Sequence, residues 1–177
     1  MLFDGTSPRT RTIELTKAPK SLDAVVTLDG EEVDAFPIDP STAFPAKGRA
    51  GLGPLMPYRP ERRSYPLFDP AAGADVPFDY LGPGSVRGLE TYKYSAELTG
   101  GCTRTVDAER RTGRIVDEIW GCGEDQWTLA EETKTSQVAA ARREVAWLRG
   151  LQVMAGVTRT IAAAAFIAGL VFYARRR

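Results

Sequence analysis

Residues 88–98 read GLETYKYSAEL, and this stretch decides the fold of the larger part of the chain. Successive side chains of a β-strand point to opposite faces of a sheet. Alternation therefore gives one face a mixed set of residues and the other face Tyr92 and Tyr94. Aromatic residues favour strands, so the stretch predicts a strand with an aromatic inner face.

Further short strand-like segments lie on both sides of this strand and are separated by turn residues. A D-G pair follows the second segment, and Gly113 closes the turn between the last two. Such spacing is typical of hairpins, and it predicts a mainly β domain built on an antiparallel sheet, as a half-barrel or a sandwich. The segments are 12–15, 25–28, 65–68, 76–81 (ending at Gly82-Pro83-Gly84), 103–106 and 114–120.

A proline-rich loop is expected at residues 35–60, where neither a helix nor a central strand can continue through the prolines. Two interpretations are open: a disordered linker, or an ordered loop that packs over the sheet. Apolar residues such as Phe44, Leu52 and Met56 favour partial order, because they can anchor the loop to a core.

The end of the chain reads LQVMAGVTRTIAAAAFIAGLVFYA from Leu151 to Ala174, followed by three arginines. As a helix it would be about 36 Å long, enough for a hydrocarbon core of about 30 Å. The span then includes Arg159, whose long side chain can reach the membrane interface. The other interpretation is a buried helix of a soluble domain. Helical spacing from Thr133 to Leu148 predicts that one long helix enters this anchor.

The sequence thus divides into a β-rich extramembrane domain at 1–127, a juxtamembrane helix at 128–150, a transmembrane helix at 151–174 and a basic cytoplasmic end at 175–177. Lys plus Arg and Asp plus Glu both number 23 in the 177 residues, so no basic excess favours nucleic acid as a partner. The chain has no histidine, the commonest general base and metal ligand. We expect no enzyme activity, no cofactor and no metal site; catalysis by carboxylates alone is the remaining alternative.

The chain has two cysteines, Cys102 and Cys122, on either side of the predicted hairpin. The hairpin places Cys102 near residues 118–120 and Cys122 just beyond its strand, close enough for a disulfide after local adjustment. Two buried thiols are the alternative. Disulfides persist on the oxidising side of a membrane, and the terminal arginines favour a cytoplasmic C-terminus. Arginines before the span weaken this charge asymmetry, and residues 1–11 show no translocation signal.

Three stretches resemble actinobacterial membrane proteins of unknown function that are labelled the porin PorA family. They are YPLFDPAAGADVPFDYLG (Tyr65–Gly82), VRGLETYKYSAEL (Val86–Leu98) and TVDAERRTGRIVDE (Thr105–Glu118). The resemblance runs from about Arg62 to the C-terminus. It implies a domain outside the cytoplasmic membrane, held in typical members by a helix at each end.

The N-terminal helix of that pattern is missing here, so we expect either a truncated or mis-started chain or a tail-anchored member. A single spanning helix cannot enclose a pore, and a channel would therefore require several copies.

The strand from Gly88 to Tyr92 and the hairpin after it are also similar to half-barrel carriers of lipids and lipoproteins in bacterial envelopes. This similarity implies an apolar face that can hold an acyl chain. The residues that would line the face are Tyr92, Tyr94, Val106, Ile115, Ile119 and Trp120. The alternative is that they only form the core under a helix or loop.

The resulting functional hypothesis is a non-enzymatic, membrane-tethered cell-envelope domain that binds a lipid, another apolar ligand or a membrane protein partner. It would be a single-pass protein of the cytoplasmic membrane with its domain outside. One alternative is an assembly or structural subunit of a larger membrane complex, since small residues in the anchor allow close helix approach. Another is an oligomeric channel component, as the porin label suggests.

Overall fold

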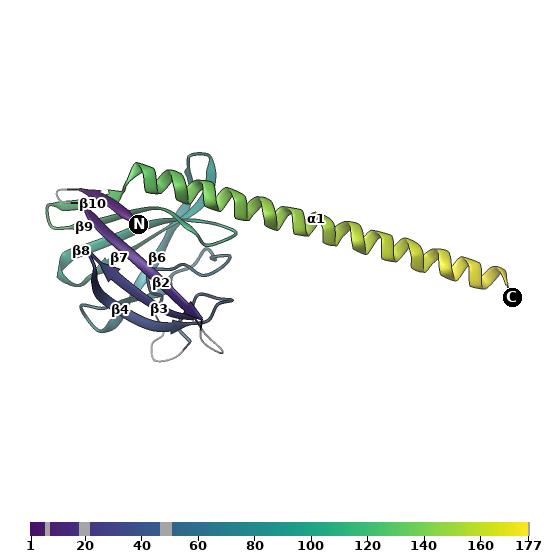
Figure 1. Cartoon of the computed structure of the whole chain (residues 1–177), viewed down its shortest axis with the longest axis horizontal. Helices are drawn as coiled ribbons and strands as arrows, with labels where there is room; N and C mark the ends of the chain where they lie inside the picture. The colour runs from purple at the N-terminus through teal and green to yellow at the C-terminus, as the bar shows by residue number, and fades with distance from the viewer. Residues whose placement is uncertain (6–7, 18–21, 47–50, 177) are drawn as a thin grey trace. The chain divides into compact units, whose positions relative to one another are not determined.

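The computed structural model describes residues 1–5, 8–17, 22–46 and 51–176. These residues form ten β-strands in one open antiparallel sheet, followed by the helix α1 at Glu131–Arg175 (Figure 1). The strands are β1 (Leu2–Gly5), β2 (Arg9–Lys17), β3 (Leu22–Leu28), β4 (Glu31–Ile38), β5 (Tyr65–Asp69), β6 (Ala74–Val86), β7 (Leu89–Leu98), β8 (Cys102–Glu109), β9 (Ile115–Cys122) and β10 (Asp125–Leu129). The predicted mainly β fold with a long C-terminal helix is confirmed.

The sheet has the strand order β4-β3-β2-β1-β10-β9-β8-β7-β6-β5. It consists of two meanders, β1 to β4 and β5 to β10, in which each strand pairs with the next one along the chain. The meanders are joined where β1 pairs with β10, with Phe3 opposite Leu129. The two end strands of the sheet are β4 and β5, which are consecutive in the chain.

Two hairpins have turns whose central residues adopt a left-handed backbone conformation. Asp29 and Gly30 have φ angles of 53° and 89°, and Arg87 and Gly88 have 49° and 77°. Positive φ at both central residues is the turn geometry that matches the twist of a two-residue hairpin. The D-G turn at 29–30 is therefore confirmed, and the R-G turn sets where β7 begins.

The prediction that a strand ends at Gly82-Pro83-Gly84 is wrong, because β6 continues to Val86. A bulge between Tyr80 and Gly82 adjusts the register with β7. Proline is tolerated because β5 pairs only with residues 74–78 of β6, which leaves Pro83 with a partner strand on one side.

The described part of the proline-rich segment is ordered and supplies part of the core, as the second interpretation of the sequence expected. Leu52 forms a parallel bridge with Leu67 of β5, and both side chains are buried. Its N–H donates to Pro66 O (2.7 Å), and its carbonyl accepts from Phe68 N–H (2.9 Å). Residues 47–50 lie outside the described residues.

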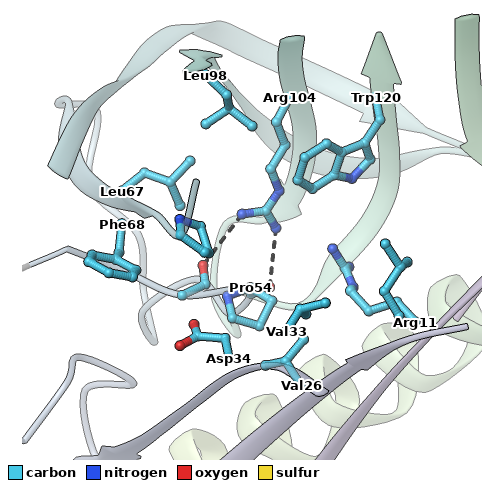
Figure 2. Close-up of a pocket in the computed structure, with 13 residues that line it drawn as sticks. Arg11, Val26, Val33, Asp34, Pro54, Leu67, Phe68, Leu98, Arg104 and Trp120 are labelled. Atoms are coloured by element: carbon cyan, nitrogen blue, oxygen red, sulfur yellow. Dashed lines mark hydrogen bonds between the residues drawn. The ribbon is translucent and has the colours of Figure 1, made fainter. Parts of the chain in front are cut away.

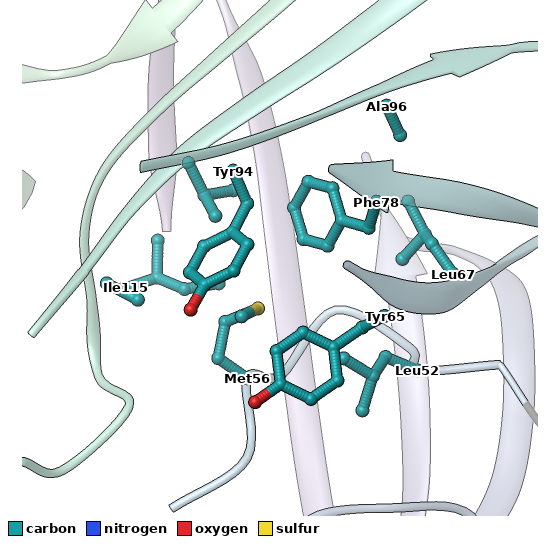
Figure 3. Close-up of a cluster of buried hydrophobic side chains, with 10 residues drawn as sticks. Leu52, Met56, Tyr65, Leu67, Phe78, Tyr94, Ala96 and Ile115 are labelled. Carbon is teal, nitrogen blue, oxygen red and sulfur yellow. The ribbon is translucent and has the colours of Figure 1, made fainter. Parts of the chain in front are cut away.

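The main core lies between this segment and the inner face of the sheet, defined here as the face that carries Tyr94 and Val106. Figure 3 shows Leu52 and Met56 of the segment beside Tyr65, Phe78 and Tyr94 of the sheet. Tyr94 stacks at tilted angles on Tyr65 and Phe78, with ring centroids 5.8 and 5.7 Å apart. The full cluster is Leu52, Met56, Tyr65, Leu67, Phe78, Tyr94, Ala96, Val106, Ala108 and Ile115.

The beginning of α1 belongs to the compact unit Met1–Ala141, which also contains the whole sheet. Val138 and Ala141 pack in a buried cluster with Val116 of β9. Lys134 Nζ lies 3.1 Å from a carboxylate oxygen of Asp117, and Arg87 pairs with Glu131. These contacts fix the first turns of the helix.

Residues 142–177 form a separate unit. Within it, α1 contains a stretch with a mean hydropathy of 1.7 and exposed side chains, so by length and composition the helix can cross a membrane. Among the described residues it is the one helix that meets this criterion. Of the predicted basic end, Arg177 lies outside the described residues.

Candidate functional site

Three charged side chains meet on the inner face, where they form what we call the Arg-Glu-Arg cluster: Arg11, Glu118 and Arg104. They are 6%, 0% and 3% exposed, respectively. Arg11 Nη1 donates to Glu118 Oε1 (2.7 Å), and Arg104 Nε donates to the same oxygen (2.8 Å). Trp120 Nε1 adds a third bond to it (2.8 Å).

Strand pairing brings these residues together. On β8 and β9, Val106 faces Glu118 and Arg104 faces Trp120 across the ladder, so alternate positions place all four on one face. Arg11 comes from β2, which is separated from β9 by β1 and β10. The long arginine side chain spans this distance.

The electrostatics of the cluster keep its glutamate ionised. Burial alone would raise the pKa of Glu118, but attraction to Arg11 and Arg104 and their hydrogen bonds outweigh it and lower the pKa to about 2. Burial lowers the pKa of Arg104, while Glu118 opposes that shift. Two arginines and one glutamate leave the cluster with a net charge of +1.

Arg104 also ties the cluster to the proline-rich segment. Its Nη1 and Nη2 donate to Gly53 O (3.4 Å) and Pro54 O (3.3 Å), as Figure 2 shows. Arg11 is less completely bonded: its Nε is buried and has no hydrogen-bond acceptor among the residues that the structure describes. A buried donor without an acceptor is uncommon in folded proteins.

Two cavities adjoin the Arg-Glu-Arg cluster. The smaller one has a volume of about 130 Å³ and lies beside the proline-rich segment (Figure 2). The larger one has a volume of about 320 Å³. Arg11, Leu28 and Trp120 line both. The remaining lining of the larger cavity is Phe3, Arg9, Cys122 and Trp127.

Aromatic side chains form much of the wall of the larger cavity, and arginines contact two of them. The Arg9 guanidinium lies 4.6 Å from the centroid of Trp127, and that of Arg11 lies 5.3 Å from the centroid of Phe3. Both distances are within the range of a cation–π contact. Trp127 also lies close against β1: a Cβ on Gly5 would be 2.6 Å from its Cδ1. The indole can therefore occupy this position because Gly5 has no side chain.

The predicted disulfide is confirmed, since Cys102 is bonded to Cys122. Its predicted register is wrong. Because β8 extends to Glu109 and β9 begins at Ile115, Cys102 lies directly opposite Cys122, not opposite residues 118–120. Cys122 also forms part of the wall of the larger cavity.

Of the six residues predicted to form an apolar ligand face, four lie together, but in the main core and not in a cavity wall. Tyr94, Val106 and Ile115 are buried in the main core, and Tyr92 packs against it. Trp120 lines both cavities. Ile119 is next to Trp120 on β9, and alternation places it on the other face.

Sequence reasoning missed most residues of the cavities and of the cluster. Strand alternation was a usable signal for two of them, because it places Arg104 on the same face as Val106 and Glu118 on the same face as Trp120. Phe3 and Trp127 gave no such signal, since they belong to strands of four and five residues. Arg11 and Leu28 join the site only through the pairing of β1 with β10.

The fold and the site define a class of protein: a β-sheet domain with a partly open, mostly apolar cavity, followed by a candidate membrane-spanning helix. A family model described as Porin PorA matches residues 24–113, which are 90 of the 177 residues. The chain belongs to the porin PorA family, as the resemblance in its strands indicated. No curated protein matches this chain.

The matched region runs from β3 to the turn after β8 and includes nearly all of the main core. It begins earlier than the resemblance read from the sequence, which started near Arg62. Arg11, Glu118 and Trp127 lie outside it. The family match therefore covers β3 to β8 and, of the residues that line the larger cavity, only Leu28.

Proposed function

We propose that the protein is a membrane-tethered domain that binds an apolar ligand in the larger cavity. The cavity itself is the observation that carries the proposal. Its volume of about 320 Å³ falls at the lower end of the range of ligand pockets, about 300 to 1,000 Å³. Apolar side chains form most of its wall, and such a wall favours transfer of hydrocarbon from water.

The proposal is for binding and not for catalysis. The chain lacks histidine, and Glu118, a carboxylate fixed beside the cavity, is held ionised by two arginines and receives three hydrogen bonds at one oxygen. A carboxylate that is so occupied is poorly suited to accept a proton from a substrate.

We further propose that the domain lies outside the cytoplasmic membrane and that the C-terminus is cytoplasmic. Two observations support this topology. The disulfide between Cys102 and Cys122 would be stable in an oxidising compartment. The arginines after the apolar stretch of α1 match the excess of positive charge on the cytoplasmic side of spanning helices.

Ligand binding can be tested with the full chain by filling the cavity. Leu28→Trp places a large side chain in the cavity wall, whereas Leu15→Trp makes the same change at a leucine of β2 that is 49% exposed. Each variant is purified from membranes, and its bound lipid is extracted and quantified by mass spectrometry per mole of protein. Equal thermal unfolding temperatures would show that both variants fold.

We expect L28W to carry several-fold less of at least one lipid species than the wild-type protein, and L15W to carry the wild-type amount. Lipid that only surrounds the anchor would be retained equally by both variants. Equal lipid profiles in all three proteins would therefore contradict binding in the cavity.

A further inference from the structure

We propose that the ligand of the larger cavity is a single acyl chain that ends in a carboxylate, with the carboxylate held by Arg9 and Arg11. This inference rests on the proposed function, since it requires that the cavity binds an apolar chain. It adds the chemical class of the ligand and the residues that select it.

The charge of the cavity lining is the first argument. Arg9 and Arg11 both line the larger cavity, and its other lining residues are uncharged. The two arginines are separated by one residue on β2, so alternation places them on the same face. Arg9 forms no ion pair with the residues that the structure describes, and its guanidinium lies on the ring of Trp127.

The bonding of Arg11 is the second argument. Its side chain is more than nine-tenths buried, and Glu118 is shared between it and Arg104. One carboxylate therefore neutralises two buried guanidinium groups, and the Nε donor of Arg11 has no acceptor within the described residues. The Arg-Glu-Arg cluster therefore has an unmatched positive charge, and Arg11, one of its members, lines the cavity.

A ligand carboxylate would supply the missing counter-charge. Guanidinium groups bind carboxylates through paired, charge-assisted hydrogen bonds. Asp34 lines the smaller cavity and not the larger one. The anionic end would therefore be directed to the larger cavity.

The size and lining of the cavity suit one hydrocarbon chain. Phe3, Leu28 and Trp127 line the space next to the arginines, so a chain that extends from a carboxylate at Arg9 and Arg11 would contact apolar side chains. A volume of about 320 Å³ is small for a molecule with two chains and a large polar head.

The test uses the full chain in phosphatidylcholine nanodiscs and follows tryptophan fluorescence. The protein has three tryptophans; Trp147→Phe removes the one in the helix, which leaves Trp120 and Trp127 at the cavity. Dibromostearic acid, ionised at alkaline pH, is compared with its methyl ester, which has the same chain and no charge. Bromine quenches the indoles only at short range. Arg9→Gln and Arg11→Lys are compared with Arg59→Gln, a change at an exposed arginine of the proline-rich segment.

We expect saturable quenching by the acid, with an affinity about tenfold or more above that of the ester. This preference should fall several-fold in R9Q and R11K and stay unchanged in R59Q. R9Q keeps the test decisive if R11K disturbs the fold, because Arg9 lies outside the buried cluster.

Equal quenching by acid and ester would overturn the charge inference and leave the apolar cavity of the proposed function intact. If neither compound quenches the fluorescence, both the proposed function and this inference are contradicted. An acid preference that persists in both arginine variants would overturn the residue assignment. Displacement of the acid by phosphatidylglycerol at equal concentration would overturn the inference that the ligand is a single chain with a carboxylate.

Discussion

Glu118 is the residue on which two buried arginines of the sheet depend. It is fully buried and bonded to both Arg11 and Arg104. A buried ion pair adds little net stability compared with well-packed apolar side chains, but removal of one partner leaves an uncompensated charge in the interior. The contribution of Glu118 to stability is therefore best measured by substitution of this residue.

Glu118→Gln is expected to lower the free energy of unfolding by about 3–5 kcal/mol, because both guanidinium groups lose their counter-charge. Urea unfolding at neutral pH, followed by tryptophan fluorescence, measures the change. Glu97→Gln on β7 is the matched control, since Glu97 is exposed. Equal stability of the two variants would show that the cluster is dispensable for folding.

The pKa of Glu118 also predicts a pH dependence of stability. The pKa is lowered from 4.5 to about 2 in the folded protein, so the unfolded chain binds a proton more readily between these values. The stabilisation is complete above about pH 4.5 and is lost as the pH falls toward 2. Urea unfolding across this range should show a shallower pH dependence in E118Q than in the wild-type protein. Parallel curves would contradict the lowered pKa.

Gly113 is required for a different reason, because its turn touches the proline-rich segment. Its φ is +70°, and a Cβ there would lie 2.1 Å from Pro57 O. Gly123 has a similar φ of +62° with no neighbour within 4 Å of its Cβ position. Alanine substitutions at the two glycines therefore distinguish the cost of a left-handed backbone from the cost of the contact with Pro57.

Gly123→Ala is expected to cost about 1–2 kcal/mol of folding stability, from the left-handed backbone alone. Gly113→Ala should cost clearly more, because Pro57 or the turn must also move. Thermal and urea unfolding of both variants measures the difference. If the two variants are equally stable, the turn and the segment are not in firm contact.

At the scale of elements, the hairpin of β8 and β9 carries both the disulfide and two members of the Arg-Glu-Arg cluster. The cysteines face each other in the register of the two strands. The bridge therefore holds together the part of the hairpin that forms the wall of the larger cavity.

Replacement of both cysteines, Cys102→Ala with Cys122→Ala, is expected to lower the free energy of unfolding by about 3 kcal/mol in the chain-entropy model for a loop of this length. Urea unfolding of the double variant and of the oxidised wild-type protein gives the value. The reduced wild-type protein should match the double variant. If reduction has no effect on stability, the bridge does not constrain the unfolded chain.

The sequence predicted elements well where side chains alternate strongly and turns contain glycine, as in β7 and in the hairpin of β8 and β9. It missed β1 and β10, because four or five residues carry too little alternation to be distinguished from a loop. It also missed β4, whose end at residues 35–38 includes Pro37 and was assigned to the proline-rich loop. It ended β6 too early, since proline within an edge segment looks the same in sequence as proline in a turn.

The site was less predictable than the fold, because it depends on contacts between segments that are far apart in the sequence. The predicted apolar face was built from neighbouring strands, and most of it is covered by Leu52 and Met56 of the proline-rich segment. The cavities depend on the contact of Arg11 and Leu28 with Trp120, which requires the pairing of strands far apart in sequence. Local patterns hold no information about that pairing.

At the scale of the whole molecule, the disulfide and the membrane-spanning candidate jointly predict a topology. In intact cells, a membrane-impermeant maleimide should label the cysteines only after treatment with an impermeant reductant. The reason is that Cys102 and Cys122 would be oxidised and outside. Cysteines that are already reduced, and are labelled only after cell lysis, would contradict a domain outside the membrane.

The junction of β1 with β10 has a consequence for how the protein is made. These strands come from opposite ends of the β-rich domain, and α1 begins immediately after β10. During synthesis from the N-terminus, the first meander must wait for nearly the entire domain before its partner strand emerges. Pairing over such a sequence separation is slow. The larger cavity, which needs both meanders, would thus be completed only after nearly the whole β-rich domain has been synthesised.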